Sequence, residues 1–493
     1  MTTDTTLDPA MRARWEPVIG LEVHAQLRTE TKLFCGCPTK FGAPPNTQVC
    51  PVCLGHPGVL PVLNRRAVEL AVRMGLATGC VVREDSIFAR KNYFYPDLPK
   101  NYQISQYDRP ICEGGALTIE AGGRTHGIGI TRIHLEEDAG KSKHPEQAGD
   151  HSTRIDLNRC GTPLIEIVSE PDLRSAAQAH AYLTALKQLL QYLEVCDGNM
   201  EEGSLRCDAN VSVRRAGTTP FGTRTELKNL NSFRFVERAI DFEIERQIRR
   251  LEAGGAVVQQ TLLWNPSLGE TRVLRSKEDA HDYRYFPDPD LPPLRVSSEW
   301  IDRVRGELSE LPAAKRARFE RDYALSFLDA GVLTQTRALA DYYEAVAAGE
   351  GVDAKSAANW IASELLGQLN KRGLAIDESP VSVGEMQSLM QRLGERKLNG
   401  KLGKMALEEM IESGATIETI VARHGWEIVA DDASLQAMVD QVIAASPTQV
   451  AEYRAGKESI YRYFVGQVMK LSKGQADAVR VDELIARALR GEP

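Results

Sequence analysis

The sequence lacks a long apolar run, and its opening residues do not predict a secretory leader. No stretch of its 493 residues is apolar for the length of a membrane-spanning helix, and the opening from Met1 to Asp8 is polar and acidic. The formal net charge of −8 also argues against a protein coated overall by nucleic acid, while it leaves room for local basic patches. These features predict a soluble, cytoplasmic protein without a membrane partner.

Several familiar catalytic motifs are missing as well. The segment 139–142 (AGKS) resembles the end of a phosphate-binding P-loop, but Leu135 stands where that loop needs its first glycine. There is no Ser-Ser-Lys amidase arrangement, no G-x-S-x-G elbow and no G-x-G-x-x-G motif after a strand. A nucleotide would have to be held in another way.

Cysteine is too sparse for a disulfide scaffold, with nine residues in the whole chain. Four of them are spaced C-x-C-x12-C-x2-C in a loop rich in glycine, proline and asparagine: Cys35, Cys37, Cys50 and Cys53. Thiolates at these spacings can close a tetrahedral site, so we predict a structural zinc ion that orders the loop. Reduced loop thiols are the alternative.

The segment from Ile130 to Lys141 is the most informative stretch. Thr131, Ile133 and Leu135 point to one side, and Arg132, His134 and Glu136 point to the other. The alternating part ends in three consecutive acids, Glu136, Glu137 and Asp138. Alternation with period two predicts a half-buried strand. Three adjacent carboxylates repel one another and need a cation or basic groups nearby; a solvated charged turn is the alternative.

Four more segments show the same alternation and each carries charged groups on one face. They are 18–27 with Glu22 and His24, 164–170 with Glu166 and Glu170, 204–214 with Ser204, Arg206, Asp208 and Asn210, and 224–230 with Arg224, Glu226 and Lys228. If the five strands share a sheet, one face is a core and the other is a polar floor.

Acids and bases are mixed on this predicted floor. Glu22, His24, Glu136 or Glu137, Glu166, Asp208 and Glu226 would lie among Arg132, Arg206 and Lys228. Carboxylate oxygens suit a hard divalent cation, and the basic side chains suit phosphate. We therefore predict Mg2+ bridging the phosphates of a nucleotide, with an exposed strand face as the alternative.

The rest of the chain predicts supporting elements and a change of domain. Amphipathic helices are expected over 64–79, 175–193 and 232–253, and the aromatic and basic segment 88–106 could stack on a base or serve only as packing. Beyond the proline-rich segment 286–294 the pattern is helical, with helices at 299–305, 313–330 and 333–348. We place domains at 1–296, 297–410 and 411–493.

A local basic patch is predicted near the end of the chain. Between Ala451 and Gln475 five basic residues (Arg454, Lys457, Arg462, Lys470, Lys473) outnumber two acids, giving +3, and tyrosines lie among them. Such a patch suits contact with a phosphate backbone. A solvated helical face is the alternative.

Long motifs of the chain resemble the B subunit of the bacterial aspartyl/glutamyl-tRNA amidotransferase, nearly from end to end. They are VIGLEVHAQL (18–27), RKNYFYPDLPKNYQISQ (90–106), HLEEDAGKS (134–142), LNRCGTPLIEIVSEPD (157–172), MEEGSLRCDANVSV (200–213), ELKNLNSF (226–233), DYRYFPDPDLPPL (282–294) and VGQVMKLSKGQA (465–476). The resemblance implies an α+β protein: a glutamine-synthetase-like antiparallel-sheet cradle domain, an all-helical domain and a small helical tail that contacts tRNA.

The resemblance also implies a reaction and its participants. Members of this family use ATP and Mg2+ to phosphorylate the side-chain carboxylate of Glu or Asp misacylated on tRNA(Gln) or tRNA(Asn). Ammonia from glutamine, released by the amidase (A) subunit of the complex and delivered through a channel, then displaces phosphate; a small C subunit joins the two. A metal-dependent hydrolase or nuclease and a noncatalytic tRNA-binding scaffold are the rival functions.

Site residues follow from the same resemblance. The implied magnesium ligands are Glu22, His24, Glu136, Glu137, Glu166, Asp208 and Glu226. The implied catalytic residues are Glu22, His24, Glu137, Glu166, Arg206, Asp208, Glu226 and Lys228, and the implied nucleotide-binding residues are Lys91, Tyr93, Arg132, Ser204, Arg206 and Lys228. His24 is expected to be a metal ligand rather than a general base. The cysteine loop occurs in only some relatives, so its zinc is not expected to be catalytic.

Overall fold

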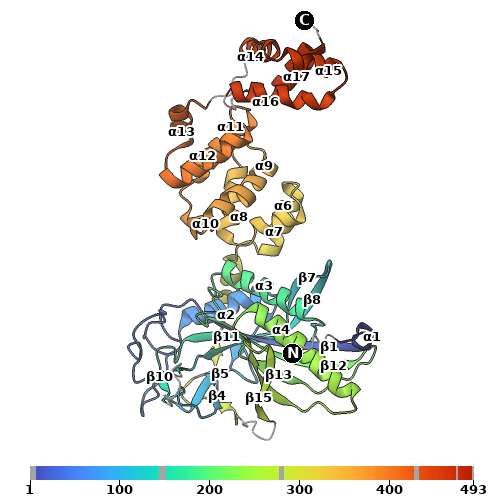
Figure 1. The fold of residues 1–493 in the computed structure, drawn as a ribbon. Helices are drawn as coiled ribbons and strands as arrows, with labels where there is room; N and C mark the ends of the chain where they lie inside the picture. The colour runs from blue at the N-terminus through green and yellow to red at the C-terminus, as the bar shows by residue number, and fades with distance from the viewer. Residues whose placement is uncertain (1–6, 144–151, 277–282, 427–431, 473–475, 491–493) are drawn as a thin grey trace. The chain divides into compact units, whose positions relative to one another are not determined.

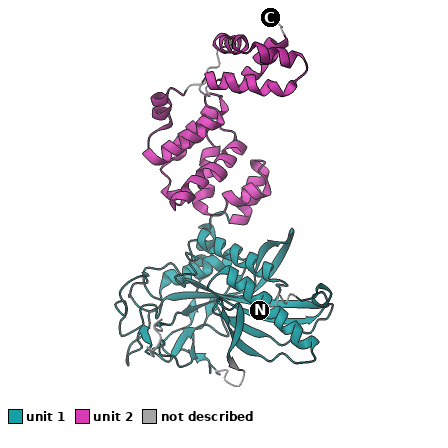
Figure 2. Cartoon of the chain, viewed as in Figure 1, with its two compact units in different colours: residues 1–311 teal, residues 312–493 magenta. Residues whose placement is uncertain are grey.

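The computed structural model describes residues 7–143, 152–276, 283–426, 432–472 and 476–490 (Figure 1). Its contacts divide the chain into two compact units, residues 1–311 and 312–493 (Figure 2). Among the described residues no helix combines the length and the apolar character needed to cross a membrane.

The first unit is built on a ten-stranded sheet. Its centre holds the five predicted strands as direct neighbours, in the order β13 (Thr225–Lys228), β12 (Leu205–Arg215), β1 (Trp15–Gln26), β11 (Pro163–Ser169) and β8 (Arg124–Glu137). Each neighbouring pair among these five is antiparallel. The prediction that the five segments share one sheet is therefore confirmed.

The register of these strands brings the predicted polar rows together. His24 lies opposite Glu166 on one side and Arg206 on the other, while Glu22 lies opposite Asp208. Glu166 in turn pairs with His134. Directly opposed residues of antiparallel strands point to the same face, so the acids and histidines share one side of the sheet.

The outer strands complete the sheet and make it mixed rather than purely antiparallel. β14 (Gln260–Asn265) runs parallel to β13, because the long helix α4 connects them, and it pairs antiparallel with β15 (Glu270–Ser276). At the other edge lie β6 (Cys112–Glu113) and β2 (Val81–Val82), and β7 (Ala116–Ala121) pairs with β8. Small sheets are formed by β9 (Lys141–Lys143) with β10 (Arg154–Asp156), by β16 (Phe286–Pro287), β4 (Ala89–Asn92) and β5 (Tyr102–Ser105), and by β17 (Leu294–Arg295) with β3 (Asp85–Ser86).

The face opposite the polar rows is the hydrophobic core. Ile19, Leu21 and Val23 of β1 are buried in it. The helices α2 (Arg65–Ala77), α3 (Ala176–Tyr192) and α4 (Phe233–Glu252) pack on this side (Figure 1). All three were predicted, and their first turns are capped by the side chains of Asn64, Ser175 and Ser232. A short α1 (Pro9–Arg12) precedes β1.

The first unit extends past the predicted boundary at Val296. Helix α5 (Ser298–Gly306) belongs to it, because Ile301 and Val304 are buried in its core. The predicted single helix over 313–330 is wrong: the chain forms α6 (Pro312–Asp322) and α7 (Phe327–Leu333), separated by a turn in which Ala324 has a φ of 50°. A left-handed residue cannot continue a right-handed helix.

The second unit is helical throughout its described part and contains two separate cores. The first core is enclosed by α6, α7, α8 (Arg337–Ala347), α9 (Ala354–Asn359), a π-helical turn (Trp360–Leu365), α10 (Leu366–Arg372), a 3-10 turn (Ile376–Glu378), α11 (Val383–Gly394), α12 (Gly400–Ser413) and α13 (Ile417–His424). The second is enclosed by α14 (Asp432–Ala445), α15 (Pro447–Arg454), a 3-10 turn (Glu458–Ile460), α16 (Tyr461–Leu471) and α17 (Ala478–Arg490). Of the predicted basic patch, Lys473 lies outside the described residues.

Candidate active site

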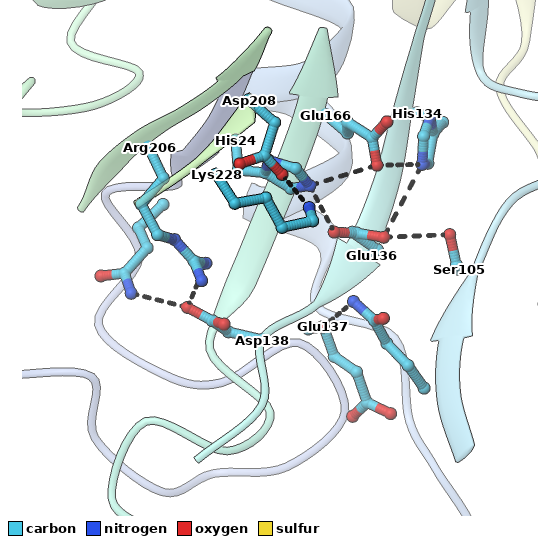
Figure 3. Close-up of polar contacts among 12 residues, drawn as sticks. His24, Ser105, His134, Glu136, Glu137, Asp138, Glu166, Arg206, Asp208 and Lys228 are labelled. Atoms are coloured by element: carbon cyan, nitrogen blue, oxygen red, sulfur yellow. Dashed lines mark hydrogen bonds and ion pairs between the residues drawn. The ribbon is translucent and has the colours of Figure 1, made fainter. Parts of the chain in front are cut away.

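Two histidines and two glutamates form the first cluster on the polar face. His24 Nε2 lies 3.3 Å from Glu166 Oε2 and 3.6 Å from Glu136 Oε1. On the other side, His134 Nε2 lies 3.4 Å from Glu166 and 3.7 Å from Glu136 (Figure 3). Ser105 Oγ donates a hydrogen bond of 3.2 Å to Glu136. Ligand atoms of His24, Glu136 and Glu166 all lie within 4.8 Å of one another, so this group could hold a metal ion.

The charges of this cluster are strongly coupled. Burial on its own lowers the pKa of His134, but Glu166 and Glu136 outweigh it and raise the pKa to about 9. Burial disfavours a charged carboxylate, yet the two histidines hold the pKa of Glu166 well below its usual range. The acids are therefore ionised and need positive charge beside them, which either the imidazolium groups or a metal ion supplies.

Three more carboxylates form a second cluster on the neighbouring strands. Lys228 Nζ contacts Asp208 and lies 2.9 Å from Glu226 Oε1, while Glu22 accepts a hydrogen bond of 2.9 Å from Asn210. Burial and the nearby carboxylates of Glu166, Asp208 and Glu226 raise the pKa of Glu22. Lys228 thus meets two of the three acids, and added positive charge would relieve the repulsion on Glu22.

Both clusters border one cavity of about 340 Å3. Glu136 lies behind the lining, in contact with the two histidines. The lining residues are Glu22, His24, Lys91, Gln106, Tyr107, Arg132, His134, Glu166, Asp208, Asn210, Arg224, Glu226, Lys228, Gln259, Gln260, Thr261, Tyr283 and Tyr285. Acids that suit a divalent cation and bases that suit phosphate therefore meet in one space.

A buried acid fixes the arginine beside this cavity. Asp138, which follows β8, accepts hydrogen bonds from Arg206 (2.7 Å) and Gln26 (2.9 Å), and Arg159 lies 3.5 Å away. These partners, chiefly Arg206, outweigh burial and keep the pKa of Asp138 low. Arg206 lies two residues before Asp208 on β12, and the charge of Asp208 contributes to the raised pKa of Arg206, after the larger effects of Asp138 and Glu136.

Outside the cysteine loop, five of the predicted site residues do not line the cavity: Glu136 and Arg206, described above, and Glu137, Tyr93 and Ser204. Glu137 follows Glu136 along β8, so its side chain points to the other side of the strand, where it contacts Lys100 and accepts a hydrogen bond of 2.9 Å from the Ile104 N–H. Tyr93 donates to Gln103 at 3.0 Å. Ser204 contacts Asp197 and donates to the Asn199 carbonyl.

Other site residues were not among the predicted ones. Alternation puts His134 on the polar row with Glu136, two residues further along, but the sequence assigns no role to this histidine. Tyr107, Tyr283 and Tyr285 come from segments outside regular strands, where no periodic signal marks them. The folding of the chain brings these three tyrosines to the cavity from segments that are distant in the sequence.

The four loop cysteines come together as predicted. Their sulfur atoms lie within 4.8 Å of one another, so they could hold a metal ion. Lys32 Nζ lies 3.5 Å from Cys53 Sγ. A hydrogen bond from Cys35, with help from the Cys50 backbone and the Lys32 charge, lowers the pKa of Cys53 to about 4. A thiolate is the form that binds metal.

Comparison with known proteins agrees with this architecture. Residues 17–302 match the model of the GatB/GatE catalytic domain, and residues 341–489 match a second GatB domain. The first match contains β1 from Pro17 onward and the other four central strands in full. The chain belongs to the family of amidotransferase B subunits. The B subunit of aspartyl/glutamyl-tRNA(Asn/Gln) amidotransferase from Geobacter sulfurreducens is 55% identical over 97% of this chain and 100% of the relative.

Two further B subunits of the same amidotransferase are equally similar. Those of Thioalkalivibrio sulfidiphilus and Halorhodospira halophila are 55% and 56% identical, each over 97% of this chain and 100% of the relative. Both units of the chain are therefore shared with the family, and the polar face of the sheet lies within its catalytic domain.

Proposed function

We propose that this chain is the carboxylate-activating subunit of a tRNA-dependent amidotransferase. It phosphorylates the side-chain carboxylate of Glu or Asp misacylated on tRNA(Gln) or tRNA(Asn) with ATP, and ammonia then converts the product to the amide. The observation that carries this proposal is the single cavity in which two carboxylate clusters meet four basic side chains, Lys91, Arg132, Arg224 and Lys228.

The donor set fits magnesium. His24, Glu136 and Glu166 would hold one ion. Asp208 and Glu226 beside Lys228, with Glu22 near both acids, offer a second set of oxygens. Bound Mg2+ would neutralise phosphate oxygens and the charge that develops during transfer. We leave Glu137 out of this set, because its carboxylate lies on the other side of β8 with Lys100.

The protein's own groups then bring two anions together. A carboxylate is a poor electrophile, so its oxygen must first attack the terminal phosphorus of ATP; ADP leaves, and the acyl phosphate formed has a leaving group that ammonia can displace. Lys91 and Lys228, which line the cavity, would bind phosphate oxygens, while Asp138 holds Arg206 at the edge of the site. No proton has to be removed from the substrate carboxylate, so His24 is assigned to metal binding.

The finer architecture and the partners belong to the same proposal. The first unit would be a glutamine-synthetase-like cradle, followed by a helical domain and a tail that contacts the tRNA body. The enzyme would work in the cytoplasm with an amidase (A) subunit, which supplies ammonia, and a small C subunit. The four cysteines would hold a structural zinc ion.

The test is ATP cleavage by the assembled complex that depends on Glu-tRNA(Gln) or Asp-tRNA(Asn). Glu136→Gln and His24→Ala should abolish formation of the amidated tRNA, while glutaminase activity of the complex persists. Transamidation retained in both variants, or phosphodiester cleavage without glutamine and a partner, would overturn the proposal.

A further inference from the structure

Three tyrosines form a stack at one side of the active-site cavity. The rings of Tyr107 and Tyr285 are parallel within 4° and their centroids lie 4.1 Å apart. The ring of Tyr283 meets Tyr285 edge-on at 6.0 Å. All three line the cavity. Tyr285 thus contacts both other rings, and Tyr107 contacts only Tyr285 of the three.

Backbone contacts hold both parts of this stack in place. Gln106, buried beside Tyr107, accepts hydrogen bonds from the N–H groups of Ile111 (3.1 Å) and Leu135 (3.0 Å). Asn92 of β4 donates its N–H to the Tyr283 carbonyl at 2.9 Å and its side-chain amide to the Arg284 carbonyl at 2.9 Å. The rings are therefore arranged before any ligand arrives, which lowers the entropic cost of binding.

The stack continues directly from the charged part of the cavity. Lys91 Nζ lies 4.8 Å from the ring centroid of Tyr283. Burial lowers the pKa of Lys91, but Glu136 and Glu166 among its neighbours outweigh it, and the pKa lies above its usual range. The charged ammonium group of Lys91 is thus close both to the acids proposed to bind metal and to the ring of Tyr283. In this position it could bind a phosphate group while the base of the same nucleotide contacts the aromatic rings.

The exposure of Tyr107 is not explained by packing in the core. A pair that serves only the core, such as Phe34 and Phe88, is 5% and 2% exposed. Tyr107 is 51% exposed although one of its faces is covered by Tyr285. Tyr107 shares its cavity with Lys91 and Arg132, and an exposed aromatic ring in a positively charged groove is the arrangement on which bases stack in nucleic-acid-binding sites.

We propose that the open face of Tyr107 stacks on an adenine base whose phosphates lie toward Lys91. This inference rests on the proposed function, which brings two adenines to the site: the base of ATP and the terminal adenosine of the aminoacyl-tRNA. The chemistry of recognition is the same for both, because every base offers a π-face to an aromatic ring.

The test measures the KM for ATP and the KM for misacylated tRNA separately in the assembled complex. Tyr107→Ala should raise one of them by about five- to a hundredfold, the usual effect of losing one stacked base, with kcat changed by less than about twofold. Tyr107→Phe keeps the ring and should keep both constants near their wild-type values. Tyr95→Ala is the matched control, because Tyr95 is also 51% exposed but does not line the cavity.

The outcomes separate the two adenines. A raised KM for ATP assigns the stack to the nucleotide, and a raised KM for tRNA assigns it to the terminal adenosine. Unchanged KM values, or a fall in kcat alone, would overturn the inference while leaving the proposed function intact.

A wild-type complex without tRNA-dependent ATP cleavage would instead refute the proposed function. The stack is then tested by the fluorescence quenching of an adenine-analogue nucleotide: quenching that is lost in Tyr107→Ala supports stacking, and equal quenching in both proteins contradicts it.

Discussion

Replacing Glu166 with glutamine tests the metal site while keeping its shape. Glu166 is 6% exposed, and its Oε2 lies 3.3 Å from His24 Nε2 and 3.4 Å from His134 Nε2. The glutamine amide can fill the same space but carries no charge. Two histidines and Glu136 would remain, so a divalent ion would lose one of its anionic ligands.

The size of the effect follows from the burial of the group. Removing one partner of a buried ion pair costs about 3–5 kcal/mol, and 1.4 kcal/mol corresponds to about tenfold in binding. The Mg2+ concentration for half-maximal ATP cleavage should therefore rise by at least about a hundredfold. The pKa of His134, which Glu166 helps to raise to about 9, should fall toward its usual value of about 6.5 in the metal-free variant.

The assay is a Mg2+ titration of tRNA-dependent ATP cleavage, together with a histidine titration by NMR. Glu170→Gln is the matched control, because Glu170 directly follows the same strand but bonds to Thr131 at an exposed position. An unchanged Mg2+ requirement in Glu166→Gln would refute the reasoning, since it would mean that no ion binds at this carboxylate.

Further predictions concern the cysteine loop, the buried His134 and the buried Glu243, which bonds to Thr225 of β13. Cys53→Ser should release about one zinc ion per chain, measured by metal analysis, and a strong chelator should lower the Tm of the wild type but not of this variant. In the metal-free protein the raised pKa of His134 stabilises the fold fully below about pH 6.5, and this contribution of about 3 kcal/mol is lost as the pH rises through about 9. Denaturant unfolding of the wild type and His134→Gln should therefore differ in pH slope over this range; parallel slopes contradict the charge coupling. Glu243→Ala should lower the free energy of unfolding by about 3–5 kcal/mol. The reason is that the buried carboxylate accepts hydrogen bonds from Thr225 (2.7 Å), Gln247 (2.8 Å) and Arg246 (2.7 Å). A Tm within about 1–2 °C of the wild-type Tm would show that these hydrogen bonds add little.

The central sheet was the most predictable part of the molecule. Strict alternation fixes which side chains share a face of a strand, and the apolar rows fix which face is the core. The grouping of Glu22, His24, Glu166, Asp208 and Glu226 on one face followed from this alone. The order of the strands did not, because it depends on pairing between segments far apart in the sequence.

The parts that were not predicted lack a local signal. Glu136 and Glu137 are adjacent acids, and alternation places Glu136 on the polar row with His134 and directs Glu137 away from it. Glu137 entered the implied ligand set through family resemblance. Tyr107 and Tyr285 meet only because two loops approach each other. The break between α6 and α7 contains neither glycine nor proline, so the apolar spacing runs through it unmarked.

Not all of the basic side chains predicted for the site line the cavity. Lys91, Arg132 and Lys228 reach the cavity, whereas Arg206 is directed to Asp138 and borders it. The alternation along a strand predicts on which face of the sheet a lysine or arginine side chain begins. Because the aliphatic part of such a side chain is flexible, its charged group can turn toward neighbouring acids. The position of that end is set by the three-dimensional arrangement of the acids.

The most direct measurement of the central claim follows the oxygen atoms of the substrate. Misacylated Glu-tRNA(Gln) labelled with 18O in its side-chain carboxylate is incubated with ATP, glutamine and the assembled complex, and the released phosphate is analysed by mass spectrometry. Transfer of phosphate to the carboxylate, followed by attack of ammonia at carbon, predicts one carboxylate oxygen in each phosphate released. Phosphate that takes its new oxygen from water instead would contradict the account, because the site would then activate water and not the carboxylate.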